Sequence, residues 1–148
     1  MSIRVDFYQL SRDPVDVTVT KLARKVMQAG ERLLVVAADE VLRERLSQVM
    51  WEQGGTSFLA NGAVDDPHAA RQPILISDHC SAPNEARIVI LADGRWREEV
   101  GTFDRAMLLF DAEAADAARD LWRELAARDG IDNRIFKQTP EGGWREGR

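Results

Sequence analysis

The chain has 148 residues, of which 45% are hydrophobic and 30% charged, and its net charge is −5. This length suits one domain that buries about 70% of its unfolded surface, and the composition excludes collagen-like, disulfide-rich and mostly disordered proteins. The single cysteine, Cys80, excludes an internal disulfide. Because no apolar run approaches the roughly 18 residues that span a bilayer and the N-terminus lacks a signal-peptide pattern, we expect one cytoplasmic domain over residues 1–148.

The first third of the chain alternates strand and helix patterns. Residues 3–10 alternate apolar and polar side chains, which predicts a strand ending at the turn cluster 11–14. Residues 15–19 also alternate, but we interpret them as the lead-in to a helix, because apolar residues then recur every three or four positions from Val19 to Met27. Gly30 ends this helix as a cap. The continuous apolar run 32–38 predicts a parallel strand covered on both faces.

A second helix is predicted from Asp39 to the glycines at 54 and 55, because acidic residues favour a helix start. Residues 56–72 carry several turn signals and predict a loose connection. Two further buried strands are predicted at 73–76 and 88–92.

The last third predicts a strand, a helix and a final strand. Residues 105–110 form an apolar strand pattern, 113–128 form an alanine-rich helix pattern that Gly130 ends, and 133–139 form a short strand pattern. The order of these elements predicts an α/β fold with a mostly parallel sheet and helices on both faces.

This fold class raises the question of nucleotide binding, which the sequence argues against. A phosphate cradle needs glycines in the first strand-to-helix turn, so that backbone N–H groups can approach the phosphates. Residues 11–16 contain no glycine, a proline without an N–H, and two acids that would repel phosphate. We therefore expect no nucleotide and no cofactor.

The segment Ser77-Asp78-His79-Cys80-Ser81 brings a thiol, an imidazole and a carboxylate together in sequence. Consecutive residues of an extended loop point in opposite directions, so adjacency does not make a catalytic triad. We interpret the segment as a polar loop. The alternative, a small nucleotide- or Cys-dependent hydrolase, predicts turnover that Cys80→Ser or His79→Ala would abolish. We expect no metal site, because the chain has only two histidines and one cysteine.

The pattern that most suggests binding lies on the last predicted helix. Arg119, Trp122 and Arg123 share one stripe by their spacing of three and four residues. The neighbouring stripe is apolar and can bury against the sheet; it consists of Ala114, Ala118, Leu121 and Leu125. A guanidinium group can donate two parallel hydrogen bonds to one carboxylate, and a partly exposed indole offers a flat apolar surface. The stripe therefore suits an acidic peptide with an aromatic end.

The charge distribution along the chain favours this interpretation, and one alternative to it stays open. Residues 119–148 carry a net charge of +1 against −6 for the rest of the chain, so this end is the more favourable one for an acidic ligand. The alternative is that Trp122 is a core residue and that the arginines pair with acids of their own helix. Those acids are Asp116, Asp120 and Glu124.

Several segments in order resemble the chi subunit family of bacterial DNA polymerase III, the small accessory protein of the clamp-loader assembly. They are VDFYQL, KLARKVMQAGERLLVVAADEVLRERLSQVMWEQGGTSFLAN, RIVILAD, MLLFD and RDLWRELAARDGIDNRIFKQTPEGGW. The resemblance covers residues 3–144. It implies a non-enzymatic adaptor with a nucleotide-binding-like fold that lacks the phosphate loop.

The resemblance also implies partners and residues. Family members bind the acidic, Phe-terminated tail of single-stranded-DNA-binding protein and the psi subunit of the clamp loader, which implies no direct contact with nucleic acid and none with a membrane. The tail-binding residues that it implies are Arg119, Trp122, Arg123, Arg128, Trp51 and Phe58. A tyrosine-lysine pair of the family is replaced here by Trp122-Arg123.

Two aromatic residues between the late strands, Trp96 and Phe103, suit a psi interface or the core. A third possibility, direct DNA binding, conflicts with the net negative charge.

Overall fold

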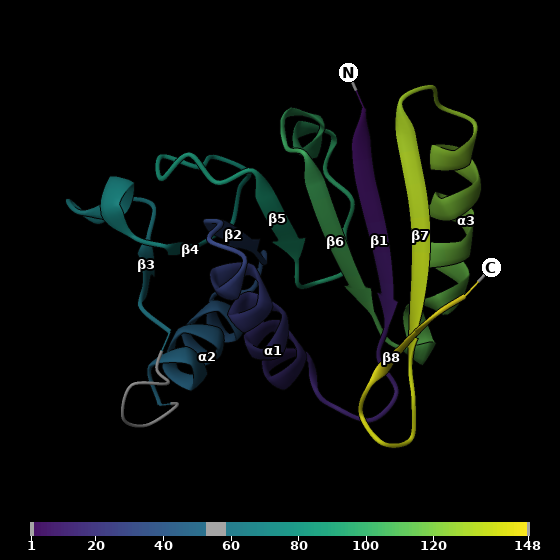
Figure 1. Ribbon diagram of the computed structural model, residues 1–148, viewed down its shortest axis with the longest axis horizontal. Coiled ribbons are helices and arrows are strands. Elements are labelled where there is room, and N and C mark those ends of the chain that lie inside the picture. Colours follow the sequence, from purple (N-terminus) through teal and green to yellow (C-terminus); the bar gives the residue numbers. More distant parts are fainter. Residues whose placement is uncertain (1, 53–58, 148) are drawn as a thin grey trace.

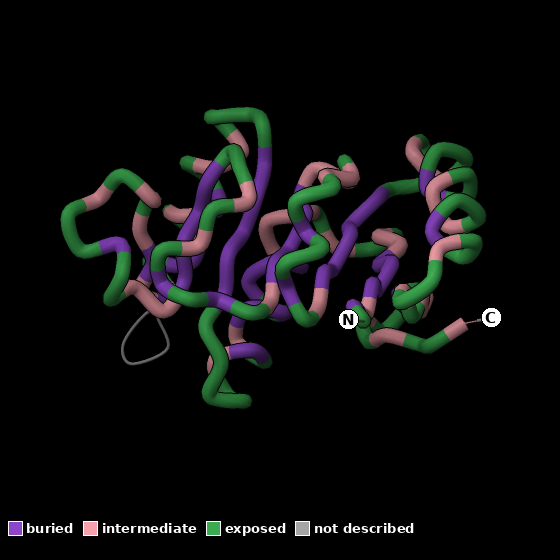
Figure 2. Tube along the Cα trace, turned by 90° about the horizontal axis from the view of Figure 1, so that it is seen from above, coloured by how far each residue is buried: buried purple, intermediate pink, exposed green. Residues whose placement is uncertain are grey.

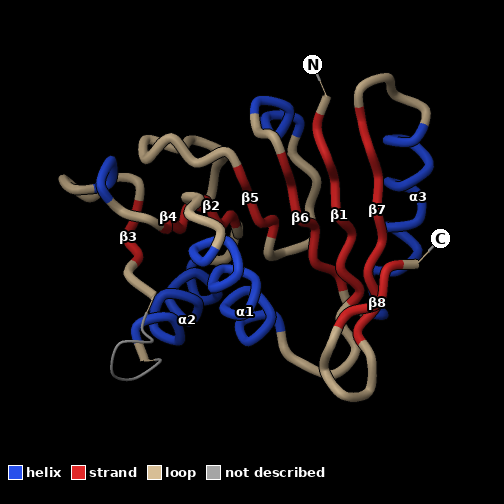
Figure 3. Tube along the Cα trace, viewed as in Figure 1, coloured by secondary structure: helices blue, strands red, loops and turns tan. Residues whose placement is uncertain are grey.

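An eight-stranded sheet with helices on both faces forms the framework of the computed structural model, which describes residues 2–52 and 59–147 (Figures 1 and 3). The regular elements are β1 (Ile3–Gln9), α1 (Val15–Gln28), β2 (Leu33–Val36), α2 (Glu40–Trp51), β3 (Asn61–Ala63), β4 (Ile74–Ser77), β5 (Ile88–Leu91), β6 (Arg105–Phe110), α3 (Ala115–Ala126), β7 (Ile131–Gln138) and β8 (Trp144–Glu146). Short 3₁₀ turns are η2 (Ala69–Arg71), η3 (Glu98–Thr102) and η4 (Ala112–Ala114).

The strand order is β3-β4-β2-β5-β6-β1-β7-β8, and every neighbouring pair is parallel except β7 with β8. This confirms the predicted α/β class with a mostly parallel sheet. No helix among the described residues is long and apolar enough to cross a bilayer.

Two cores, one on each face of the sheet, explain why the central strands lack polar alternation. Leu34 and Val36 of β2 belong to the core beneath α3, whereas Leu33 and Val35 belong to the core beneath α1 and α2. The buried strands stand out in the end-on view (Figure 2). Because successive side chains point to opposite faces, a strand covered on both sides must be apolar throughout.

The helices follow the predicted apolar stripes. In α1, Val19, Leu22 and Val26 are buried, and Gly30 ends the segment with a φ of 76°. In α2, Asp39 caps the first turn by accepting a hydrogen bond from the Val41 N–H at 3.0 Å. In α3, Leu125 is fully buried.

Three features differ from the sequence predictions. The short edge strands β3 and β8 were not predicted, because each has three residues and little apolar pattern. The last helix begins with the 3₁₀ turn η4 and reaches α-helical geometry only at Ala115. The predicted end of the second helix at Gly54-Gly55 lies outside the described residues.

A buried carboxylate joins β1 to β6 on the α1 face of the sheet. Asp6 is fully buried and accepts hydrogen bonds at 2.7 Å from the Nε atoms of both Arg4 and Arg105. The Arg105 guanidinium also donates to the Tyr8 hydroxyl at 3.3 Å. Each guanidinium keeps about a third of its side chain exposed, so the charged cluster is only partly desolvated.

We expect Asp6→Asn to lower the free energy of unfolding by about 1–3 kcal/mol, because an amide N–H₂ would face a guanidinium in place of a charged acceptor. Urea denaturation measures the change. Asp132→Asn is the control, since the Asp132–Arg134 pair on the neighbouring strand is exposed, and it should cost about 0.5 kcal/mol or less. Equal losses for the two variants would contradict this role for Asp6.

Candidate functional site

The chain leaves the sheet in opposite directions after two adjacent strands. β1 leads to α1 on one face and β6 leads to α3 on the other, while Gln9 and Phe110 at their carboxyl ends are in register. In open α/β sheets, ligands bind in the crevice that such a divergence leaves. The topology alone therefore identifies the carboxyl ends of β1 and β6 as the candidate site.

A pocket of about 390 Å³ lies at this divergence, between α3 and the ends of β1, β6 and β7. Its volume falls within the range of pockets that hold small ligands. The lining residues are Phe7, Gln9, Phe110, Ala115, Ala118, Arg119, Trp122, Ile135 and Lys137. The described residues also line two other cavities: one of about 480 Å³ between α2 and the ends of β3 and β4, and one of about 400 Å³ between the segment after β4 and η3.

Aromatic rings form the floor and one wall of the α3 pocket. Phe7 and Phe110 are buried, and the half-buried indole of Trp122 meets the Phe7 ring edge-on with centroids 5.1 Å apart. The Trp122 carbonyl accepts a hydrogen bond from Asn133 Nδ2 at 3.1 Å, which ties α3 to β7. Trp122 therefore packs against the core with one part of its surface and lines the pocket with another.

Two cations stand on the rim from opposite sides, Arg119 from α3 and Lys137 from β7. The Arg119 side chain is 63% exposed, and its Nη1 lies 3.3 Å from Asp116 Oδ1. Arg123, one turn further along α3, is not among the residues that line the pocket; its side chain is 72% exposed and its Nη1 lies 3.7 Å from Asp120 Oδ1. Exposed pairs of this kind contribute little energy, so both guanidinium groups remain available to a ligand.

The other predicted tail-binding residues lie elsewhere. Arg128 donates to both carboxylate oxygens of Glu98, at 2.7 and 3.0 Å, and to Glu124 at 2.7 Å. These bonds raise the pKa of Arg128 and lower the pKa of Glu98. Arg128 thus ties the end of α3 to η3.

Trp51 ends α2, which packs against the opposite face of the sheet near β3 and β4, far from α3 (Figure 1). The structure does not bring it near Trp122. Phe58 lies outside the described residues.

The predicted psi-interface residues pack against the core on the α3 face. Phe103 is buried, with 5% of its surface exposed, and Trp96 packs partly buried against the same cluster. Of the two, only Trp96 presents part of its ring at the surface.

The Ser77–Cys80 segment does not form a catalytic triad. His79 Nδ1 lies 2.7 Å from Asp78 Oδ1 and 3.1 Å from Ser77 Oγ, so the acid and the hydroxyl share one ring nitrogen. A triad needs the acid on one nitrogen and the nucleophile on the other. Burial raises the pKa of the Cys80 thiol, which disfavours the reactive thiolate.

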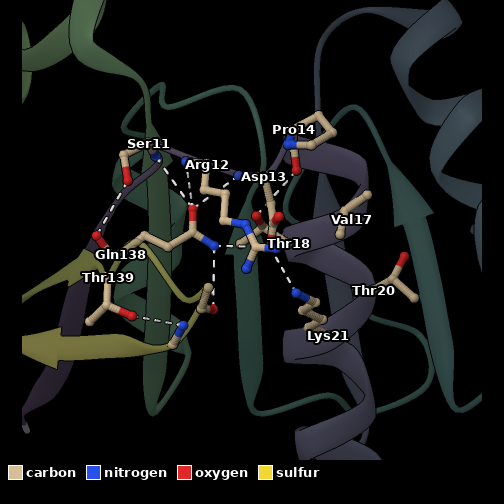
Figure 4. A network of polar contacts seen from close by, with 12 residues as sticks. Ser11, Arg12, Asp13, Pro14, Val17, Thr18, Thr20, Lys21, Gln138 and Thr139 are labelled. Atoms are coloured by element: carbon tan, nitrogen blue, oxygen red, sulfur yellow. Dashed lines mark hydrogen bonds and ion pairs between the residues drawn. The ribbon is translucent and has the colours of Figure 1, made fainter.

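The first strand-to-helix turn binds a side chain of the protein itself (Figure 4). Gln138 Oε1 accepts hydrogen bonds from the backbone N–H groups of Ser11, Arg12 and Asp13, at 3.4, 2.9 and 3.0 Å. Successive N–H groups in this turn are what nucleotide-binding folds offer to phosphate. Here the amide oxygen of Gln138 takes that position.

The same side chain also fixes the C-terminal hairpin. Gln138 Nε2 donates to Asp13 Oδ2 at 2.9 Å, and Ser11 Oγ donates to the Gln138 carbonyl at 3.3 Å. Lys21 donates to Asp13 Oδ2 at 2.8 Å, and this bond is the main reason that the pKa of Asp13 is lowered. β7 and β8 are thereby held against the turn that follows β1.

Sequence reasoning did not single out three residues of this region, Gln9, Lys137 and Gln138. Gln9 and Lys137 could have been found from strand alternation, which places them on the same face as Phe7 and Ile135. Gln138 had no local signal, because its partners are about 125 residues away in the chain.

Comparison with known proteins decides the family. The family model described as "DNA polymerase III chi subunit, HolC" matches residues 1–131. The chain belongs to this family. It is also similar to a "Probable DNA polymerase III subunit chi" of Rickettsia prowazekii (strain Madrid E), with 23% identity over 146 residues that cover 93% of this chain and 87% of the relative. The protein is thus a DNA polymerase III accessory subunit that acts in DNA replication, and it is not a catalytic enzyme.

We expect Gln138→Ala to lower the free energy of unfolding by about 1–2 kcal/mol, because the turn loses the acceptor for its N–H groups. Thermal and urea unfolding measure this loss. Gln48→Ala is the matched control, since that exposed amide contacts only Glu52 among the described residues and its loss should be within about 0.5 kcal/mol. A Gln138→Ala variant as stable as this control would argue against a structural role for the amide.

Proposed function

We propose that this chi subunit binds the acidic, Phe-terminated C-terminal tail of single-stranded-DNA-binding protein in the pocket beside α3. The observation that carries the proposal is the combination of an aromatic floor with cations on both sides of one pocket. A phenyl ring would pack against Phe7, Phe110 and Trp122, and carboxylates would meet Arg119, Arg123 and Lys137. Trp51 is not part of this site, because it lies on the other face of the sheet.

The geometry favours a chain end over an internal peptide segment. The pocket is only about 390 Å³ and Phe7 and Phe110 close its floor, so it takes one ring rather than a continuous peptide. A terminal residue carries a ring and a free carboxylate side by side, which matches an apolar pocket with guanidinium groups on its rim.

We also propose that the subunit contacts the psi subunit and so links the clamp loader to single-stranded-DNA-binding protein. Membership of the polymerase III chi family supports a role inside a protein assembly. The proposed psi contact is near Trp96 and Phe103. Because Phe103 is buried, it would pack behind the contact surface, and the partly exposed Trp96 would touch psi.

The first test measures the contribution of the two α3 arginines, of which Arg119 lines the pocket and Arg123 lies one turn further along the helix. Arg119→Ala and Arg123→Ala should each weaken binding of a synthetic acidic peptide ending in Phe by about 1–3 kcal/mol, through loss of a charge-assisted contact. Isothermal titration at two salt concentrations measures the affinity, which should fall as salt rises. Arg87→Ala is the control, because its exposed pair with Asp104 lies at the amino-terminal edge of the sheet.

The second test measures the apolar part of the pocket. Ala115→Leu fills space at the lining while keeping a good helix former, so it should reduce peptide affinity by about tenfold or more without lowering the melting temperature.

Full-length single-stranded-DNA-binding protein should lose binding when its last residues are removed. Undiminished binding to the truncated protein, or to Ala115→Leu, would place the contact elsewhere.

A further inference from the structure

The C-terminal hairpin sets two cations directly opposite each other. Lys137 of β7 is in register with Arg145 of β8, and both are exposed. Residues paired across antiparallel strands project from the same face of the sheet. Because Lys137 lines the α3 pocket, Arg145 stands beside that pocket on the same face.

This arrangement weakens the hairpin in the absence of a ligand. Like charges directly opposite on antiparallel strands are destabilising. Within residues 2–52 and 59–147, neither Lys137 nor Arg145 forms an ion pair with a carboxylate. The one acid of β8, Glu146, is in register with Phe136 and so belongs to the opposite face.

Other cations of this region have partners within the chain. Arg119, Arg123 and Arg134 each lie within 4 Å of an acid two or three residues away, at 3.3, 3.7 and 3.1 Å. The pair on the hairpin differs from them, because its two like charges are in register and no acid of the described residues lies within ion-pair distance of either one. An anionic ligand at the pocket would offset both.

We infer that Lys137 and Arg145 bind side-chain carboxylates that precede the terminal Phe of the ligand, across the pocket from the arginines of α3. The inference rests on the proposed function and adds a second contact region to it. In an extended peptide, side chains two residues apart lie on one face about 7 Å apart, within reach of two long side chains on neighbouring strands. The ligand is therefore an acidic segment with carboxylates on alternate residues.

The hairpin that carries this contact region consists of β7 and β8 and is anchored to the rest of the fold. The Gln138 amide and the turn bond from Thr139 N to the Gly143 carbonyl, at 2.8 Å, hold the hairpin in place beside the pocket.

The experiment titrates wild-type protein and single variants with two synthetic peptides. One peptide has aspartates on alternate residues before a terminal Phe, and the other has asparagines in their place. Arg145→Gln and Lys137→Gln should each weaken the aspartate peptide by about 3- to 10-fold and reduce the salt dependence of its binding. Arg145→Gln should not change the affinity for the asparagine peptide by more than about 2-fold, because Arg145 is not among the residues that line the pocket. Lys137→Gln should also weaken the asparagine peptide, but less than the aspartate peptide, because Lys137 lines the pocket that takes the terminal carboxylate.

A charge reversal separates a binding role from a structural one. Arg145→Glu would face Lys137 with an opposite charge, so the melting temperature should rise by about 1–4 °C while affinity for the aspartate peptide falls by about 5- to 20-fold. Arg134→Glu is the control, because Arg134 is on β7 but on the opposite face, and it should change affinity by about 2-fold or less.

The outcomes separate the two proposals. If wild-type protein binds neither peptide, the proposed function fails and this inference fails with it. If wild type binds the aspartate peptide and the Lys137 and Arg145 variants bind it equally well, the α3 pocket stands and the hairpin contact is overturned. Equal losses for both peptides would also overturn it, because the contact would then not be with the upstream carboxylates.

Discussion

The amide of Gln138 is the contact on which the arrangement of the carboxyl-terminal edge depends. The turn after β1 presents three N–H groups that need an acceptor, and in nucleotide-binding folds a phosphate supplies it. Here the acceptor comes from the last residue of β7. The Gln138 side chain therefore occupies the position that a phosphate takes in those folds, and it also anchors the hairpin that continues from β7.

The pocket beside α3 follows from this anchoring together with the topology. Divergence of the chain after β1 and β6 leaves a crevice, as it does in other open α/β sheets. Here α3 and β7 enclose that crevice, and Phe7, Phe110 and Trp122 make it apolar. Such a surface suits a ring and a carboxylate better than a pyrophosphate, because it offers guanidinium groups and aromatic faces and no free row of backbone N–H groups.

Most of the framework could be predicted from the sequence, because the information was local. The apolar runs of β2, β4, β5 and β6 and the helical stripes of α1 and α3 depend on residues a few positions apart. The stripe on α3 also placed Arg119 and Trp122 together, and both line the pocket. What could not be predicted depends on distant partners. Arg128 pairs with Glu98, thirty residues upstream, and Gln138 bonds to the turn at the other end of the chain.

For the proposed acidic ligand, the charges close to the pocket would have to overcome the negative charge of the whole chain. The chain carries a net charge of −5, so its long-range field opposes such a partner, and attraction must come from local groups. On α3, acids of the same helix lie beside the arginines and offset part of their attraction. On the hairpin, Lys137 and Arg145 are in register with each other, and within residues 2–52 and 59–147 neither pairs with an acid. A carboxylate of the proposed ligand between them would offset their repulsion, so the free energy lost in the unbound hairpin would be recovered on binding. The hairpin would then discriminate for acidic residues more strongly than two isolated exposed charges.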